Sequence, residues 1–227
     1  MPQVIDLLPF DQSEFAENPE PRCACVLVLD VSRSMAGRRI DELNAGLQAF
    51  QDELAADTLA RKRAEIAIVT FGPVKIESQF QTAEDFRAPT LVTQGDTPMG
   101  SAIETALDLL DARKAHYKQA GIGYYRPWVF VITDGAPTDA WQKAAQRIHA
   151  GEGRNFSFFA VAVEGANLQI LNQLSKRAAT PLKGTKFREL FLWLSSSLKA
   201  VSMSKPNDKV KLLNPGTPEG YGWTEIQ

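Results

Sequence analysis

The sequence predicts an α/β fold: a doubly wound domain whose central sheet is mostly parallel, with one antiparallel edge strand and helices on both faces. Runs of apolar residues with the length of strands alternate along the chain with segments in which apolar residues recur every three or four positions. This alternation requires crossover connections between parallel strands, and these connections bring helices onto both faces of the sheet.

The first predicted strand, 23–29, is a continuous apolar run rich in branched residues, which is typical of a strand buried on both faces. The segment 65–71 has the same character. After Gly72 and Pro73, the segment 74–80 alternates apolar and polar residues and therefore predicts a half-exposed edge strand joined by a tight hairpin. Two further buried strands are predicted over 128–133 and 156–163.

Five segments have the periodicity of helices. The first carries one apolar stripe, made of Ile40, Leu43, Leu47, Phe50 and Leu54. The second opens at Thr97 and Pro98, because proline fits the first helical position, where its missing N–H costs nothing. The others are predicted over 139–149, 168–174 and 187–201. We expect Thr138 and Asp139 to cap the helix that follows Pro137.

Composition indicates one ordinary globular domain. With 227 residues, 44% of them hydrophobic and 23% charged, the chain can bury a full core, and this excludes a disordered, fibrous or disulfide-scaffold protein. Residues 1–21, which Pro9, Pro19 and Pro21 interrupt, are expected to form an N-terminal arm, 22–204 the domain, and 205–227 an extended C-terminal tail.

Charge and hydropathy argue against nucleic acid and membranes as partners. Lysine and arginine total 25 against 27 aspartates and glutamates, with no basic block in the chain. No signal-peptide pattern is present and no apolar run approaches ~18 residues, so we expect a cytoplasmic protein. Cys23 and Cys25 are interpreted as reduced core thiols that point to opposite faces of their strand and cannot bridge each other.

Polar residues follow two of the predicted strands. The first strand runs into the sequence Asp30-Val-Ser32-Arg-Ser34, and Asp134 follows the strand over 128–133. Thr97 lies in a loop that ends where a helix starts. Because ligands in open α/β sheets bind at the carboxyl ends of the strands, we expect these side chains to meet at one edge of the sheet.

These five side chains suit a hard divalent cation. Two carboxylates and three hydroxyls are the oxygen ligands that Mg²⁺ prefers, with Mn²⁺ or Ca²⁺ as alternatives, and the absence of cysteine and histidine among them argues against zinc. The hydroxyls add little charge, so the metal keeps a strong affinity for an anionic oxygen. An aspartate or glutamate from a protein partner is then a natural further ligand.

This pattern resembles the metal-ion-dependent adhesion site of von Willebrand factor type A (VWA) domains, over the range from residue 23 to about residue 202. The resemblance implies a VWA, Rossmann-like fold and a protein-binding function. It also implies that the serines and the threonine bind the metal directly, while the aspartates act directly or through water. The residues to which this applies are Ser32, Ser34, Thr97, Asp30 and Asp134.

Arg33 departs from the pattern, because members of the family commonly have glycine at this position. A cation here either repels the metal or reaches toward an acidic ligand.

The chain is also similar to the bacterial TerY-type branch of the family, which is associated with tellurium resistance and chemical stress. The segments that carry this similarity are 97–102, 126–139 followed by Trp141, and 191–197. The resemblance implies a cytoplasmic, metal-dependent assembly module with phosphatase- or kinase-like partners.

The sequence leaves two other functions open. A metal-dependent phosphohydrolase or phosphotransferase also places an aspartate after the first strand, but the haloacid-dehalogenase type needs a carboxylate two residues later, where this chain has Ser32. Phosphate-loop and hydrolase-elbow motifs are missing, so we expect a protein that is not an enzyme. In an autoregulatory alternative, Glu225 or the C-terminal carboxylate occupies the metal of the same or a neighbouring chain.

Overall fold

Strand β1 (Cys23–Asp30) lies in the middle of a six-stranded sheet with the order β3-β2-β1-β4-β5-β6. The computed structural model describes residue 15 and residues 17–225. All neighbouring strands pair in parallel except β2 and β3, which are antiparallel, so the predicted fold class is confirmed. The other strands are β2 (Ala64–Phe71), β3 (Lys75–Thr82), β4 (Trp128–Thr133), β5 (Ser157–Ala162) and β6 (Thr180–Pro181).

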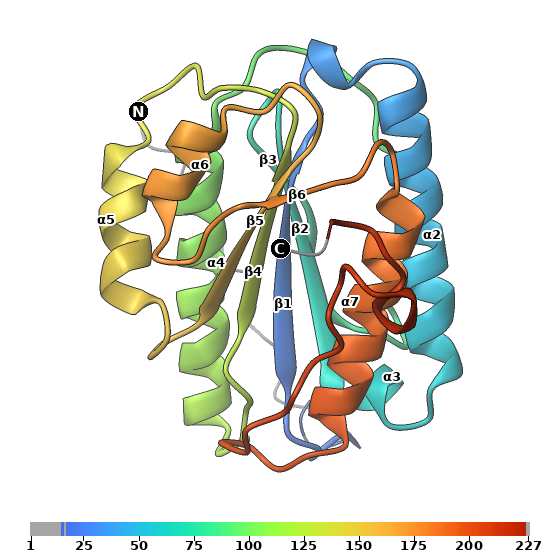
Figure 1. Cartoon of the computed structure of the whole chain (residues 1–227). Helices are drawn as coiled ribbons and strands as arrows, with labels where there is room; N and C mark the ends of the chain where they lie inside the picture. The colour runs from blue at the N-terminus through green and yellow to red at the C-terminus, as the bar shows by residue number, and fades with distance from the viewer. Residues whose placement is uncertain (1–14, 16, 226–227) are drawn as a thin grey trace.

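Helices cover both faces of the sheet (Figure 1). One face carries α2 (Arg38–Ala56), α3 (Ala60–Arg63) and α7 (Phe187–Ser202), and the other carries α4 (Met99–Gln119), α5 (Gln142–Gly151) and α6 (Leu168–Leu174). Two short 3-10 helices are η1 (Arg33–Met35) and η2 (Pro218–Gly220). Within the described part of the chain, no helix is both long enough and apolar enough to cross a bilayer.

The shortest elements were not predicted. Helix α3 has four residues, β6 has two, and η1 and η2 have three each. Segments this short show no hydrophobic period, so only their tertiary contacts define them.

Strand β1 divides its side chains between two cores, and all eight of its residues are buried. Cys23, Cys25, Leu27 and Leu29 face the core formed with α2 and α7, whereas the intervening residues face the core formed with α4. The expectation that the two cysteines point to opposite faces is therefore wrong, because strand residues two positions apart share a face. Both thiols are free, and burial raises the pKa of Cys23 to about 12.

A buried charge cluster lies at the end of the sheet where β2 begins. Glu65 accepts hydrogen bonds from Nε of Arg22 at 2.8 Å, from Nε of Arg113 at 2.7 Å, and from the hydroxyl of Tyr117. Glu65 and Arg22 are fully buried, so these contacts replace the water that both charges lose on folding. The cluster lies at the opposite end of β2 from its carboxyl terminus and thus away from the predicted site.

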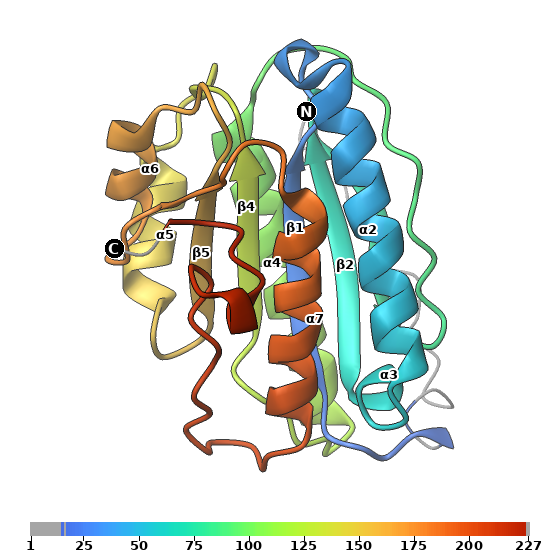
Figure 2. The ribbon, with the colours of Figure 1, turned by 45° about the vertical axis from the view of Figure 1, so that its right-hand side comes forward.

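The C-terminal segment folds back over the α7 face of the sheet, as Figure 2 shows. Trp223 is 2% exposed and its ring centroid lies 5.6 Å from that of Trp193. The backbone N–H of Lys183 donates to the carbonyl of Trp223 at 2.8 Å, and Nε1 of Trp193 donates to the carbonyl of Leu213 at 2.9 Å. The segment is irregular apart from η2, and its division from the domain at residue 205 stays a prediction.

Helices α2 and α7 approach each other most closely at Gly46. A Cβ at this position would lie 2.6 Å from a ring carbon of Phe191 and 3.1 Å from the backbone carbonyl of Phe187. Because the second contact is with helical backbone, it cannot be relieved by a change of rotamer. Glycine here sets the spacing of the two helices.

We predict that Gly46→Ala destabilises the protein, although alanine has the higher helix propensity. The propensity gain is about 1 kcal/mol, whereas overpacking costs about 1–3 kcal/mol. Urea unfolding measures the difference, and we expect a net loss of about 1 kcal/mol in the free energy of unfolding. Gln48→Ala, on the exposed face of the same helix, is the control and should change stability by less than about 0.5 kcal/mol. A stabilised Gly46→Ala variant would contradict the close approach.

Candidate metal centre

The five predicted side chains come from three segments at the carboxyl edge of the sheet. Asp30 is the last residue of β1, Asp134 follows β4, and Thr97 lies two residues before α4. Because β1 and β4 pair in parallel with Leu29 opposite Ile132, Asp30 and Asp134 lie close together at the carboxyl ends of these two strands. Asp30, Ser32, Thr97 and Asp134 are buried, and Ser34 is exposed.

Asp30 is held by neutral donors on both carboxylate oxygens. The backbone N–H of Ser32 donates to Oδ1 at 2.8 Å, and the hydroxyl of Thr133 donates to Oδ2 at 2.5 Å. Burial raises the pKa of Asp30 above its ordinary value, and the nearby charge of Asp134 adds to the increase, while the hydrogen bonds from Ser32 and Thr133 oppose it. The carboxylate is therefore oriented, but its charge is not neutralised by any of these contacts.

The two serines connect the first segment to Asp134. The hydroxyls of Ser32 and Ser34 share a hydrogen bond at 3.0 Å, and Ser34 Oγ donates to Asp134 Oδ1 at 2.6 Å. The second carboxylate is thus joined through side chains to a residue 100 positions earlier in the sequence. The spacing of two residues between the serines brings both hydroxyls to the same side of the loop.

Gly135 lies beside both Thr97 and Asp30. A Cβ on Gly135 would lie 3.3 Å from Thr97 Oγ1 and 3.9 Å from Asp30 Oδ2. The space beside Gly135 is therefore bordered by a hydroxyl oxygen and a carboxylate oxygen. All five predicted residues are brought together, and Gly135, which follows Asp134 in the predicted pattern, lies among them.

The loops that carry the site are fastened to one another by backbone hydrogen bonds. The N–H of Gln94 donates to the carbonyl of Val31 at 2.8 Å, and the N–H of Thr138 donates to the carbonyl of Thr97 at 2.9 Å. Gly72 lies beneath them with a φ of +109°, and a Cβ there would approach the backbone nitrogen of Ser32 to 2.8 Å. Glycine is needed at this position both for its backbone conformation and for the close approach.

Arg39 is the charged neighbour that the sequence did not reveal. Its Nη1 donates to Asp134 Oδ2 at 2.6 Å and to the carbonyl of Ser34 at 3.2 Å. Arg33, which the sequence singled out as the cation beside the site, is exposed. The only available signal for Arg39 was its place in the first turn of the helix that follows the serine motif.

The residue types fit a hard divalent cation. The group offers two buried carboxylates, those of Asp30 and Asp134, together with three hydroxyls, and contains no thiolate or imidazole. In residues 15 and 17–225, no group of three or more histidine, cysteine, aspartate or glutamate side chains could hold a metal ion. The candidate centre has two such side chains, and its other oxygens are hydroxyls. Zinc, which takes nitrogen and sulfur ligands, does not match these side chains.

Asp139 caps α4, so the prediction that it caps the following helix is wrong. Its Oδ1 accepts from the N–H of Gly100 at 2.9 Å, and its Oδ2 accepts from the N–H of Ser101 at 2.8 Å and from that residue's hydroxyl at 2.7 Å. Helix α5 begins at Gln142 without a side-chain cap. The β4–α5 loop crosses the start of α4 in space, and this tertiary proximity decides which helix receives the carboxylate.

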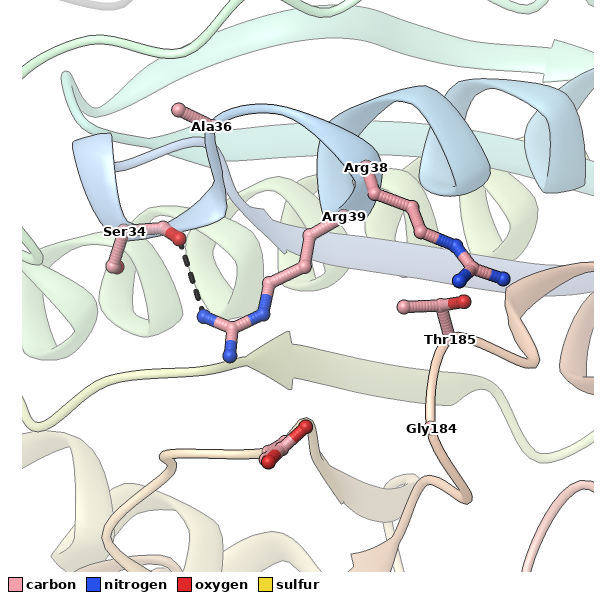
Figure 3. Close-up of a pocket in the computed structure, with 7 residues that line it drawn as sticks. Ser34, Ala36, Arg38, Arg39, Gly184 and Thr185 are labelled. Carbon is pink, nitrogen blue, oxygen red and sulfur yellow. Dashed lines mark hydrogen bonds between the residues drawn. The ribbon is translucent and has the colours of Figure 1, made fainter.

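A pocket of about 510 Å³ adjoins the candidate centre at Ser34 (Figure 3). We refer to it as the flanking pocket. It is lined by Ser34, Ala36, Arg38, Arg39, Glu164, Gly184 and Thr185.

Glu225, proposed above as an internal ligand, lines a different pocket of about 540 Å³ together with Lys183 and Lys186. The two pockets share no lining residue. The C-terminal carboxylate of residue 227 lies outside the described residues.

Fold and site together define an α/β domain that presents a cluster of oxygen ligands at the carboxyl edge of a mostly parallel sheet. The family model of the von Willebrand factor type A domain matches residues 25–191, which is more than half of the chain. The chain therefore belongs to the VWA domain family.

Solved structures share this fold at low sequence identity. The pilus adhesin SpaC from Lactobacillus rhamnosus GG is 12% identical with a TM-score of 0.63, over 80% of this chain and 30% of the adhesin. Proximal thread matrix protein 1 from the mussel byssus is 16% identical with a TM-score of 0.51, over 86% of this chain and 50% of that chain. The SpRpn10 VWA domain is 11% identical with a TM-score of 0.52, over 74% and 93%. No curated protein matches the sequence.

We predict that Asp139→Ala lowers the free energy of unfolding by about 1–2 kcal/mol, because the first turn of α4 loses its cap. Urea unfolding tests this. Ser101→Ala, which removes one of the three hydrogen bonds and leaves both backbone donors capped, should cost clearly less. Equal losses in the two variants would show that the hydroxyl contact, and not the cap, stabilises this turn.

Proposed function

We propose that this protein is a metal-ion-dependent protein-binding module, in which Mg²⁺ is held by Asp30, Ser32, Ser34, Thr97 and Asp134. Mn²⁺ and Ca²⁺ are the alternative ions. The observation that carries the proposal is the meeting of two buried carboxylates with three hydroxyls at one edge of the sheet. In this proposal the bound ion supplies an electrophilic position for an aspartate or glutamate oxygen of the partner.

Charge supports this assignment. Asp30 and Asp134 place two negative charges in a buried position, and Arg39 is the cation that contacts one of them. A divalent cation among these groups changes the sum of their charges from about −1 to about +1, which favours an incoming carboxylate. Ser34 is exposed and so leaves the centre open on one side.

Membership of the VWA family also supports a binding role, and one of the structural neighbours is named as a pilus adhesin. From the segments 97–102, 126–139 and 191–197 we further propose a TerY-type protein of a bacterial stress or tellurium-resistance system. Under this proposal the protein acts in the cytoplasm with phosphatase- or kinase-like partners.

We propose that the protein is not an enzyme. The position two residues after Asp30, where a phosphotransferase of the type considered above needs an acid, holds Ser32, whose hydroxyl is bonded to that of Ser34. The two histidines lie on α4 and α5, and His116 is near the end of α4 that is remote from the candidate centre. These placements offer no general base at the centre.

Calorimetric titration of Mg²⁺ and Mn²⁺ into the chelator-treated protein tests the metal assignment. We expect binding by the native protein and no detectable binding by Asp30→Ala or Ser32→Ala, because each loses an oxygen of the centre. Asp96→Ala is the matched control, since this exposed carboxylate is adjacent to Thr97 but has no part in the proposed site. A native protein that takes up neither ion, or a loss of binding in Asp96→Ala alone, would contradict the assignment.

The binding role is tested with a fluorescent peptide that carries one glutamate in a glycine–serine background. We expect a rise in fluorescence anisotropy on titration with protein in Mg²⁺ and none in EDTA or with Thr97→Ala. The same peptide with glutamine in place of glutamate should not bind. Binding that is equal in Mg²⁺ and EDTA would show that the acidic peptide does not use the metal.

A further inference from the structure

Arg39 belongs to both the candidate centre and the flanking pocket. Its side chain is 31% exposed, and its Nη1 is fixed by Asp134 Oδ2 and by the carbonyl of Ser34. Figure 3 shows the guanidinium extending from the start of α2 into the space between Ser34 and the loop that carries Gly184 and Thr185. The contact with the buried aspartate therefore orients a cation that solvent can reach.

The opposite edge of this guanidinium is available for a ligand. In the described part of the chain, Nε and Nη2 of Arg39 have no hydrogen-bond partner, and Arg39 lines the flanking pocket. The Nε and Nη2 hydrogens of an arginine point in the same direction, and their spacing matches the two oxygens of a carboxylate. A lysine could not offer such a pair of donors.

The charges around the pocket favour an anion. Arg38 is 78% exposed, and its one ion pair is a surface contact with Glu42 at 3.5 Å. Glu164 is the acidic residue of the lining, which thus has two positive charges and one negative. Glu164 disfavours a carboxylate, whereas the two arginines of the lining favour one through the donors that Asp134 and Glu42 leave free.

We propose that the flanking pocket is a second carboxylate-binding site, so that the partner of this protein presents two acidic side chains within one segment. The first carboxylate binds at the candidate metal centre, and the second binds the Nε–Nη2 edge of Arg39, with Arg38 adding to the positive field. This inference rests on the proposed function for the role of the first carboxylate. The two arginines that would bind the second carboxylate are not metal ligands, although Ser34, which also lines the pocket, belongs to the proposed centre.

The test compares the peptide with one glutamate and a set of peptides with a second glutamate placed one to four positions later. At saturating Mg²⁺, we expect the best peptide with two glutamates to bind about fivefold tighter, as one additional partly exposed ion pair contributes. The quantity compared between variants is the ratio of the two affinities. A change confined to the metal centre alters both affinities equally and leaves this ratio unchanged.

Variants distinguish a specific contact in the flanking pocket from a general effect of protein charge on the affinity ratio. Arg39→Lys keeps the charge but loses the paired donors, and we expect it to bring the ratio toward one. Arg38→Gln should also lower the ratio toward one. Glu164→Gln should increase the ratio. Lys118→Gln, an exposed position at the far end of α4, is the matched charge control and should not change the ratio. Calorimetry with Mg²⁺ on each variant monitors the metal centre separately.

The second site would be overturned if the native protein gave a ratio of one at every spacing. It would also be overturned if neither arginine substitution changed the ratio. Binding of the two-glutamate peptide that depends on Arg39 but persists in EDTA would support the second site and contradict the proposed function. If neither peptide binds in Mg²⁺, both proposals are overturned.

Discussion

The parallel pairing of β1 with β4 is the constraint on which the rest of the site depends. It places Asp30 beside Thr133, whose hydroxyl donates to Asp30 Oδ2 at 2.5 Å, and it puts Asp134 one residue beyond. A shift of this register by one residue would turn the side chains at the strand ends to the other face. The continuous apolar runs that make both strands core elements therefore also determine where the two carboxylates meet.

The cost of burying these carboxylates explains the neighbouring polar groups. Asp30 is oriented by neutral donors, and Asp134 by Ser34 and by the guanidinium of Arg39. A buried carboxylate without such partners would be costly, and the two negative charges also raise each other's energy. In our account the divalent ion completes this neutralisation, while Arg39 extends the positive region from the centre into the flanking pocket.

The fold and the meeting of the five candidate residues could be predicted from the sequence, because apolar runs define the strands. Four of the five candidates lie at or just after the ends of two of these strands, and Thr97 lies just before a helix. What could not be predicted depends on contacts between distant segments. Arg39 shows no pattern until α2 is placed beside Asp134, and Asp139 caps a helix that begins 40 residues earlier in the chain because two loops meet in space. Trp223 is buried in a segment whose composition is otherwise that of an exposed tail.

We propose above that a divalent cation binds among Asp30, Ser32, Ser34, Thr97 and Asp134. The most direct measurement is anomalous X-ray diffraction, at the manganese absorption edge, from crystals grown in Mn²⁺. We predict an anomalous peak at the carboxyl edge of the sheet, in contact with oxygens of the two serines and the threonine. Full manganese peaks elsewhere in the molecule, with none at this edge, would contradict it.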